Sequence, residues 1–183
     1  MHIILLVGLP GCGKSTVANY IRDNFGAAIF LSGDVIREEI RRRGLKYTPE
    51  NDAKIAHWFH SGRENLVVSR IWAKAKKSRR KIIVIDGFRS EKELIFLKKI
   101  AKTRPYVISI LACQNVRVKR ELSRGRFGRK ESVAYVKFRD RLEKSHGITK
   151  LMSRADYRID NTRLSVSQSE SRVSKIIKAI IAN

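Results

Sequence analysis

The chain has 183 residues, of which 43% are hydrophobic, enough for one well-packed domain and too few for two ordinary ones. No apolar run approaches the ~20 residues of a membrane-spanning helix, and no basic region or cleavage site marks a signal peptide, so we expect no membrane partner. Forty Lys and Arg against 17 Asp and Glu give a net charge of +23, which indicates either a polyanion partner such as RNA or DNA, or a lineage-wide basic bias that favours solubility.

Apolar runs typical of buried parallel strands recur along the chain. They cover residues 2–7, 28–31, 82–86, 106–112 and, more weakly, 157–160. Continuous rather than alternating hydrophobicity is what a sheet covered on both faces requires. Because helical patterns lie between the runs, we expect one doubly wound α/β domain over residues 1–183.

Capping signals mark where the helices between these runs begin and end. The first helix follows a glycine-rich turn and should end at Gly26, and the next should begin near Asp34. Thr48 is a favoured N-cap and Pro49 a favoured first helical residue. They open what we expect to be one long helix that runs past Ile71.

Two later helices are predicted from Ser-x-x-Glu patterns, Ser90–Glu93 and Ser167–Glu170, which are typical of capping boxes. Within the long helical pattern, His57 and His60 stand three residues apart. They have no third ligand in register, so we expect them at the surface or in a groove rather than in a metal site.

The most informative segment follows the first apolar run and reads Gly-Leu-Pro-Gly-Cys-Gly-Lys-Ser-Thr. Glycines here let backbone N–H groups point at phosphate oxygens, and the N-terminus of the next helix adds a favourable dipole. This is the pattern of a phosphate-binding loop, or P-loop, and it predicts that the chain binds ATP with Mg²⁺. The expected nucleotide-binding residues are Gly8, Pro10, Gly11, Cys12, Gly13, Lys14, Ser15 and Thr16.

Four side chains have expected roles around this loop. Lys14 should reach the β- and γ-phosphates, and the Ser15 hydroxyl should bind Mg²⁺. Asp86 closes the third predicted strand, where the second magnesium ligand usually stands. Asp34 follows the second strand, either as the group that orients the acceptor or acts as its base, or as a helix N-cap; the sequence favours neither.

Arginines gather after the predicted strands. Arg37 and Arg89 should project into the crevice beyond the carboxyl edge of the sheet. A transition state that spreads charge over three oxygens suits a cluster of guanidinium groups, although a solvated basic helix face would have the same composition. The basic run is Arg117, Lys119, Arg120, Arg124, Arg126, Arg129 and Lys130, followed by Arg139 and Arg141.

Taken together, these motifs resemble the nucleoside monophosphate kinase family. The matching segments are Gly33-Asp-x-x-Arg37, Asp86-Gly-Phe-Arg89, Arg120-x-x-x-Arg124 and Arg139-Asp-Arg141. The resemblance implies a five-stranded parallel sheet in the order 2-3-1-4-5, with Arg37 and Arg89 on the acceptor's phosphate. It also implies Arg120 and Arg124 at the phosphates and base of ATP, and Arg139 or Arg141 between the two substrates.

Over nearly its whole length the chain is similar to the archaeal adenylate-kinase-related P-loop proteins. The segment Ala155–Asn161 also resembles a stretch of dephospho-coenzyme A kinases near the ATP base, which implies that Asn161 lies there. Two features depart from adenylate kinase: no proline separates Phe88 from Arg89, and the glutamine that reads the acceptor's adenine is not identifiable.

The sequence therefore predicts a P-loop kinase with an acceptor-binding helical segment at about 34–80 and a short lid at about 120–141. It would transfer a phosphoryl group from Mg·ATP to a small phosphorylated acceptor such as a nucleotide. The charge favours two alternatives, an RNA-binding ATPase or assembly factor and a kinase of polynucleotide ends. The only two cysteines, Cys12 and Cys113, suggest a reducing, cytoplasmic setting.

Overall fold

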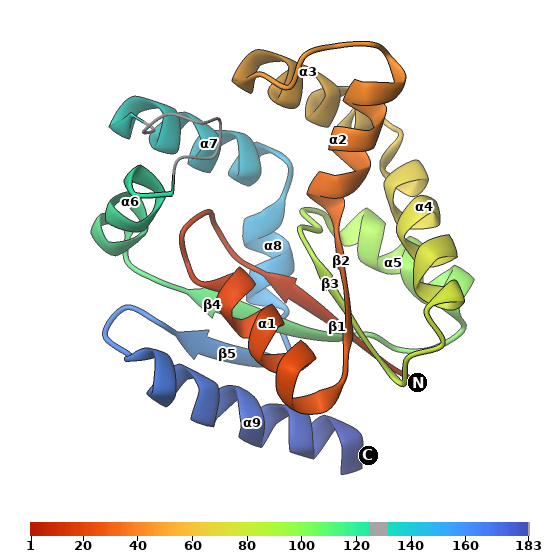
Figure 1. Ribbon diagram of the computed structural model, residues 1–183, viewed down its shortest axis with the longest axis vertical. Helices are drawn as coiled ribbons and strands as arrows, with labels where there is room; N and C mark the ends of the chain where they lie inside the picture. The colour runs from red at the N-terminus through yellow and green to blue at the C-terminus, as the bar shows by residue number, and fades with distance from the viewer. Residues whose placement is uncertain (125–131, 183) are drawn as a thin grey trace.

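The computed structural model describes residues 1–124 and 132–182. Its strands form one parallel sheet in the order β2-β3-β1-β4-β5, which confirms the predicted α/β class and strand order (Figure 1). Their bounds are β1 (His2–Val7), β2 (Ala28–Leu31), β3 (Ile82–Asp86), β4 (Tyr106–Leu111) and β5 (Tyr157–Asp160).

Helices cover both faces of the sheet, because successive side chains of a strand point to opposite faces. From β1, Ile4 and Leu6 pack with α1 (Lys14–Phe25) and α9 (Val166–Ala182). On the other face, β1 packs against α4 (Glu64–Lys77), α5 (Glu91–Ala101) and α8 (Ile148–Ser153). The continuous apolar runs of the sequence are thus explained by a core on each side.

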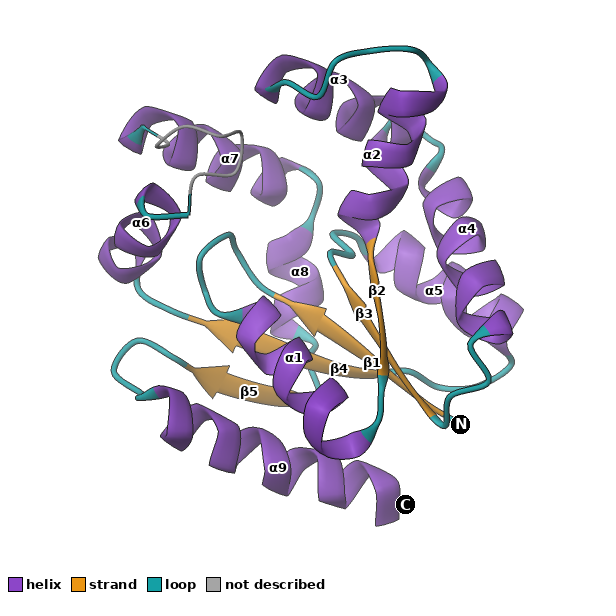
Figure 2. Ribbon diagram, viewed as in Figure 1, coloured by secondary structure: helices purple, strands orange, loops and turns teal. Residues whose placement is uncertain are grey.

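Four helices stand beyond the carboxyl ends of the strands (Figure 2). On one side, α2 contacts α3, and on the other α6 contacts α7. Their bounds are α2 (Ser32–Arg42), α3 (Pro49–His60), α6 (Gln114–Leu122) and α7 (Val133–Ser145). The two pairs frame the end of the sheet at which the P-loop lies. Of the predicted lid, Arg126, Arg129 and Lys130 fall outside the described residues.

Two helix boundaries differ from the prediction. The expected long helix is broken into α3 and α4 at Gly62, whose φ of +83° is favoured only for glycine. Helix α2 begins at Ser32 with Leu31 as its N-cap. The N-cap alternative for Asp34 is therefore wrong, because this residue lies inside the first helical turn.

The capping boxes gave one correct and one shifted prediction. Ser90 and Glu93 form the expected box at the start of α5. At α9 the reciprocal hydrogen bonds join Ser165 and Gln168 instead, at 3.2 and 3.0 Å. The predicted Ser167–Glu170 box is thus two residues too late, because glutamine at the third helical position serves as well as glutamate.

Candidate functional site

A cavity of about 500 Å³ opens where β1 and β3 end. The two strands are neighbours, with Leu6 of β1 opposite Asp86 of β3. The P-loop, which follows β1, therefore lies beside Asp86. The cavity continues from the P-loop to Arg37, Asp52 and Arg89 at its far end. We call these two parts the P-loop end and the acceptor end.

Close backbone contacts shape the P-loop. A Cβ at Gly8 would lie 2.3 Å from the Ile110 carbonyl oxygen, and one at Gly11 2.5 Å from that of Arg117. Gly13 is the N-cap of α1 and has no side chain to bind the first N–H groups of the helix. These donors face the place where an anion would be bound.

Lys14 is half-buried at the start of α1. Its Nζ donates to the carbonyl oxygens of Gly8 and Leu9, at 2.7 and 3.4 Å. Burial disfavours its charge, but Cys12, Asp86 and Glu143 outweigh that effect and raise the pKa of Lys14. The lysine is therefore charged and held by neutral oxygens that a phosphate could replace.

Asp86 has an oxygen, Oδ1, that is buried and has no hydrogen-bond partner among the described residues. Burial raises the pKa of this carboxyl group, and the charge of Lys14 opposes the shift. A buried carboxylate oxygen without a partner calls for a cation or donor that binding would supply. Together with the exposed Ser15 hydroxyl, it forms a set of hard oxygen ligands that fits Mg²⁺.

Two arginines, one in α6 and one in the turn after it, contact the P-loop. Arg120 donates to the carbonyl oxygens of Gly11 at 3.3 Å and Asn161 at 3.2 Å. Arg124 lies 3.4 Å from the Ser15 hydroxyl. Both line the cavity; Arg120 binds neutral carbonyl oxygens, and Arg124 also pairs with Glu121 at 3.3 Å.

Arg117, by contrast, is buried in the protein and holds elements of the fold together. It is 4% exposed, binds both oxygens of Asp140 at 2.7 Å and donates to the Pro10 carbonyl oxygen at 3.1 Å. The buried pair ties α6 to α7 and to the P-loop.

At the acceptor end, Arg89 is held on all sides of its guanidinium group. Its Nε and Nη2 donate to the two oxygens of Glu143 at 2.5 and 3.1 Å, and its Nη1 lies 3.0 Å from Nε2 of His60. Burial would raise the pKa of Glu143, but Arg89, Arg139 and Lys14 lower it to about 2. Glu143 is therefore a carboxylate at neutral pH.

The remaining arginines of this end also meet carboxylates. Arg139 lies 3.2 Å from Glu121 and 3.9 Å from Glu143, and Arg37 donates to Asp34 at 2.5 Å. Asp34 itself is not part of the cavity wall, whereas Arg37 is. Asp52 of α3 lines the cavity too, and its carboxylate has no ion-pair or hydrogen-bond partner within residues 1–124 and 132–182.

Besides Asp34, three predicted residues are not part of the cavity wall. Cys12 is buried beneath the loop at 1% exposure, as a small core side chain. The Asn161 amide donates to the Cys12 carbonyl oxygen at 3.2 Å and lies behind Gly13. Arg141 is exposed on α7, so Arg139 is the arginine of this pair that the structure brings to the cavity.

The acidic half of the site was not predicted from the sequence. Asp52, Glu121 and Glu143 line the cavity but belong to no motif. The only hint was spacing, because Glu143 stands four residues after Arg139 and can meet it on one helix face. His60, expected at the surface or in a groove, is packed on His146 with ring centroids 4.2 Å apart and contacts Arg89.

Comparisons with known proteins place the chain in a family. The model of the AAA domain matches residues 7–135. A UPF0200 protein of Hyperthermus butylicus is 31% identical over 97% of this chain and 94% of its own length. A UPF0200 protein of Pyrobaculum aerophilum is 34% identical over 97% of each chain.

Solved structures agree on the fold. A shikimate kinase from Acinetobacter baumannii in complex with shikimate superposes with a TM-score of 0.63 at 20% identity, over 100% of this chain and 94% of its own. A gluconokinase from Sinorhizobium meliloti superposes with a TM-score of 0.59 at 13% identity, over 98% and 95%. Among the described residues, no helix combines the length and the apolar character of a membrane span.

Proposed function

The chain belongs to the UPF0200 family and has a P-loop kinase-like fold, and on this premise we propose that it is a phosphotransferase that uses Mg·ATP and a small phosphorylated acceptor such as a nucleotide. The observation that carries the proposal is the two-ended cavity. A phosphate-binding loop with an unpartnered buried carboxylate oxygen forms one end, and Arg37 and Arg89 form part of the other.

At the P-loop end, the backbone N–H groups and Lys14 would hold the β- and γ-phosphates. Ser15 and Asp86 would hold the metal ion. Mg·ATP supplies the phosphoryl group and neutralises part of its charge. Because phosphoryl transfer demands positioning and charge neutralisation more than covalent help from the protein, fixed cations are the main catalytic need. Arg124, beside Ser15, is placed to supply one.

At the acceptor end, Arg37 is the more accessible anion ligand, because its side chain is 37% exposed and that of Arg89 is 14% exposed. Arg89 is screened by Glu143, so an acceptor phosphate would have to share or displace that carboxylate. The role of Asp34 that fits this geometry is to orient Arg37. Asp52 could accept a hydrogen bond from a hydroxyl or amino group of the acceptor.

The test is a measurement of ADP formation from Mg·ATP against a panel of acceptors. The panel contains nucleoside monophosphates, dephospho-coenzyme A, shikimate and RNA ends, with a sample without acceptor. Transfer is expected to depend on one small acceptor and to yield its phosphorylated product in proportion to ADP. ADP and inorganic phosphate at the same rate without any acceptor would show an ATPase instead.

Asp86→Asn tests whether the measured transfer comes from this site, because asparagine keeps the size of the side chain and removes its charge. It should abolish transfer while the protein remains folded by circular dichroism. Full activity in this variant, or no binding of nucleotide by the unaltered protein, would contradict the proposed site.

A further inference from the structure

Charge is distributed unevenly between the two ends of the sheet. At the carboxyl end, arginines meet carboxylates: the buried Glu39 binds Arg42, Arg43 and Arg70 at 2.6 to 3.0 Å. The pairs made by Glu121, Asp140 and Glu143 lie in the same region. Much of the positive charge around the cavity is thus compensated within the fold.

The amino end of the sheet has the opposite character. Five of the six residues from 76 to 81 are Lys or Arg, at the end of α4 and in the loop into β3. At the end of α5 and in the loop into β4, Lys98, Lys99 and Lys102 follow. All these basic side chains are exposed, and no ion pair within residues 1–124 and 132–182 involves them.

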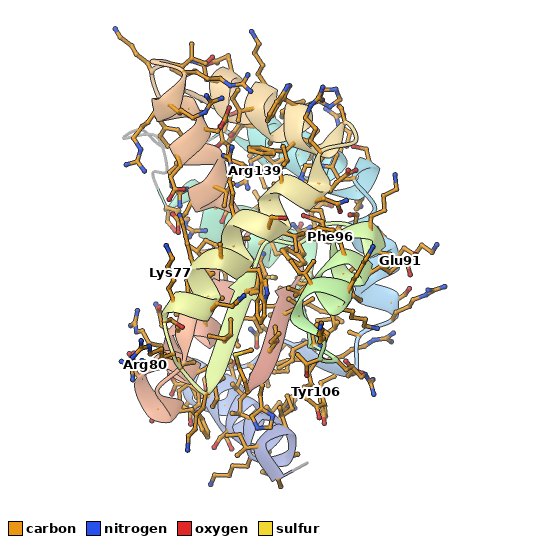
Figure 3. All side chains as sticks on the ribbon, turned by 90° about the vertical axis from the view of Figure 1, so that its right-hand side faces the viewer. Lys77, Arg80, Glu91, Phe96, Tyr106 and Arg139 are labelled. Atoms are coloured by element: carbon orange, nitrogen blue, oxygen red, sulfur yellow. The ribbon has the colours of Figure 1, made fainter. Side chains whose placement is uncertain are left out.

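The topology brings the two segments together. Strands β3 and β4 flank β1 on either side, with His2 opposite Ile82 and Ile4 opposite Tyr106, and α4 packs along α5. Figure 3 shows Arg80 and Tyr106 toward the same end of the molecule and Arg139 toward the other. Segments 76–81 and 98–102 therefore form one surface, which we call the amino-edge face.

The acidic residues near this edge do not offset the charge. Asp23 is paired with Arg22 and Asp156 with Arg104, and both arginines lie outside the two segments. Basic residues near a helix C-terminus stabilise the helix by offsetting its dipole. One or two cations per helix are enough for that effect. The amino-edge face holds eight basic side chains over two helices and the loop after the first.

We propose that the amino-edge face binds the phosphate backbone of nucleic acid, without strong sequence preference. A row of phosphodiesters offers the closely spaced negative charges that uncompensated, exposed Lys and Arg would neutralise. Nucleic acid fits better than an anionic membrane, because neither segment carries an exposed apolar side chain that could insert among lipids. The proposal does not depend on which acceptor the cavity takes.

The position of this face separates it from the catalytic cavity. The strands of five or six residues at ~3.3 Å per residue set the two ends of the sheet apart. A strand of nucleic acid bound to the amino-edge face would leave the cavity open. The end of that strand would not lie at Lys14. The face therefore fits an enzyme that is held on nucleic acid while it acts on a small acceptor, rather than a kinase of polynucleotide ends.

The test compares two triple variants of the full chain with the same change of net charge. Lys77→Glu, Arg79→Glu and Arg80→Glu alter the face; Lys137→Glu, Lys144→Glu and Arg163→Glu, all exposed, are the matched control. Fluorescence anisotropy would measure binding to a labelled single-stranded RNA, a duplex DNA and vesicles that contain phosphatidylserine, over a series of salt concentrations. ATP binding by each variant serves as the measure of an intact fold.

We expect the unaltered protein to bind RNA or DNA with a log–log salt slope of about −0.7 to −0.9 for each phosphate neutralised. The face variant should lose at least tenfold in affinity and lower the slope, and the control should stay within twofold. The comparison of RNA with DNA identifies the source of the phosphates. An equal loss in both variants, no binding near physiological salt, or tighter binding to vesicles through the same residues would each overturn the proposal.

Discussion

The two ends of the cavity hold their cations in different ways. At the P-loop end, Lys14 and Arg120 donate to backbone carbonyl oxygens, and Arg124 to a hydroxyl and to Glu121. At the acceptor end, Arg89 forms a two-pronged ion pair with Glu143. Neutral partners are exchanged for phosphate at little cost, whereas displacing a carboxylate from a buried guanidinium group is expensive.

This difference indicates how each end selects its ligand. The P-loop end can bind any chain of phosphates, and most of its binding free energy comes from charge. The acceptor end combines Arg37 and Arg89 with Asp52 and Glu143, so its charges nearly balance. An acceptor must therefore match a pattern of positive and negative groups, which favours recognition of one molecule over general binding of anions.

Among the cations of the cavity, the largest expected effect is that of Lys14→Ala on phosphoryl transfer. Loss of a cation that acts on the transferred charge should lower kcat by about 10²–10³-fold, as for other preorganised donors. The melting temperature should change little, because the partners of Nζ in the part of the chain that the structure describes are P-loop oxygens and the Cys12 sulfur. Steady-state kinetics and thermal melting measure both. Full activity in a folded variant would remove Lys14 from the mechanism.

Arg89→Ala tests the acceptor end. If Arg89 binds the acceptor, the KM for acceptor should rise about 10- to 100-fold, equivalent to the ~1.5–3 kcal/mol of a charged hydrogen bond. The KM for ATP should stay nearly constant. An equal loss for ATP and acceptor in steady-state kinetics would contradict the assignment.

The control for Arg89→Ala addresses the negative charge of Glu143, which this substitution leaves without its partner. Without Arg89, Glu143 is a buried carboxylate that lacks its main partner, and such a loss costs about 3–5 kcal/mol. The double variant Arg89→Ala, Glu143→Gln should recover much of this stability in chemical denaturation without recovering the acceptor KM. Recovery of both would mean that Arg89 acts only by neutralising Glu143.

Arg120→Ala should have a smaller effect, at the P-loop end only. Its exposed side chain gives up hydrogen bonds to two neutral carbonyl oxygens, each worth about 0.5–1.5 kcal/mol. We expect a KM for ATP raised by a few-fold and an unchanged KM for acceptor. A shift in the acceptor KM as large as that in the ATP KM would show that the two ends are not independent.

The smallest expected effect is a pH dependence of stability from His60. Burial, together with the positive charge of Arg89, lowers the pKa of this imidazole to about 2, below the ~6.5 of an unfolded histidine. Below pH 6.5 the unfolded chain therefore binds a proton that the folded chain does not, and stability falls as the pH drops, by at most about 1.4 kcal/mol per pH unit.

His60→Asn should remove this contribution. The difference in unfolding free energy between the unaltered protein and the variant should then narrow as the pH is lowered from 6.5 to 5.5. Urea denaturation at a series of pH values measures it. A difference that stays constant over this range would mean that the pKa of His60 is the same in the folded and the unfolded chain.

Local sequence was sufficient where structure follows from a few neighbouring residues. The five strand positions, the P-loop and the Ser90–Glu93 cap depend on hydrophobic runs, on glycine and on spacing, and the structure confirms them. The break at Gly62 and the cap at Ser165 were misjudged, because several local signals there compete and packing selects among them.

The sequence by itself determined the strands of an α/β domain, the P-loop and Asp86 at the end of β3, because each is written in contiguous residues. The strand order was implied by the family resemblance. Only the tertiary structure decided which arginines reach the cavity and what neutralises them. Glu143 is 54 positions from Arg89, and Asp140 is 23 positions from Arg117. Such pairs arise from the packing of α7 against α6 and α8, and no local periodicity encodes them. The same holds for the amino-edge face, because only strand order brings residues 76–81 and 98–102 together.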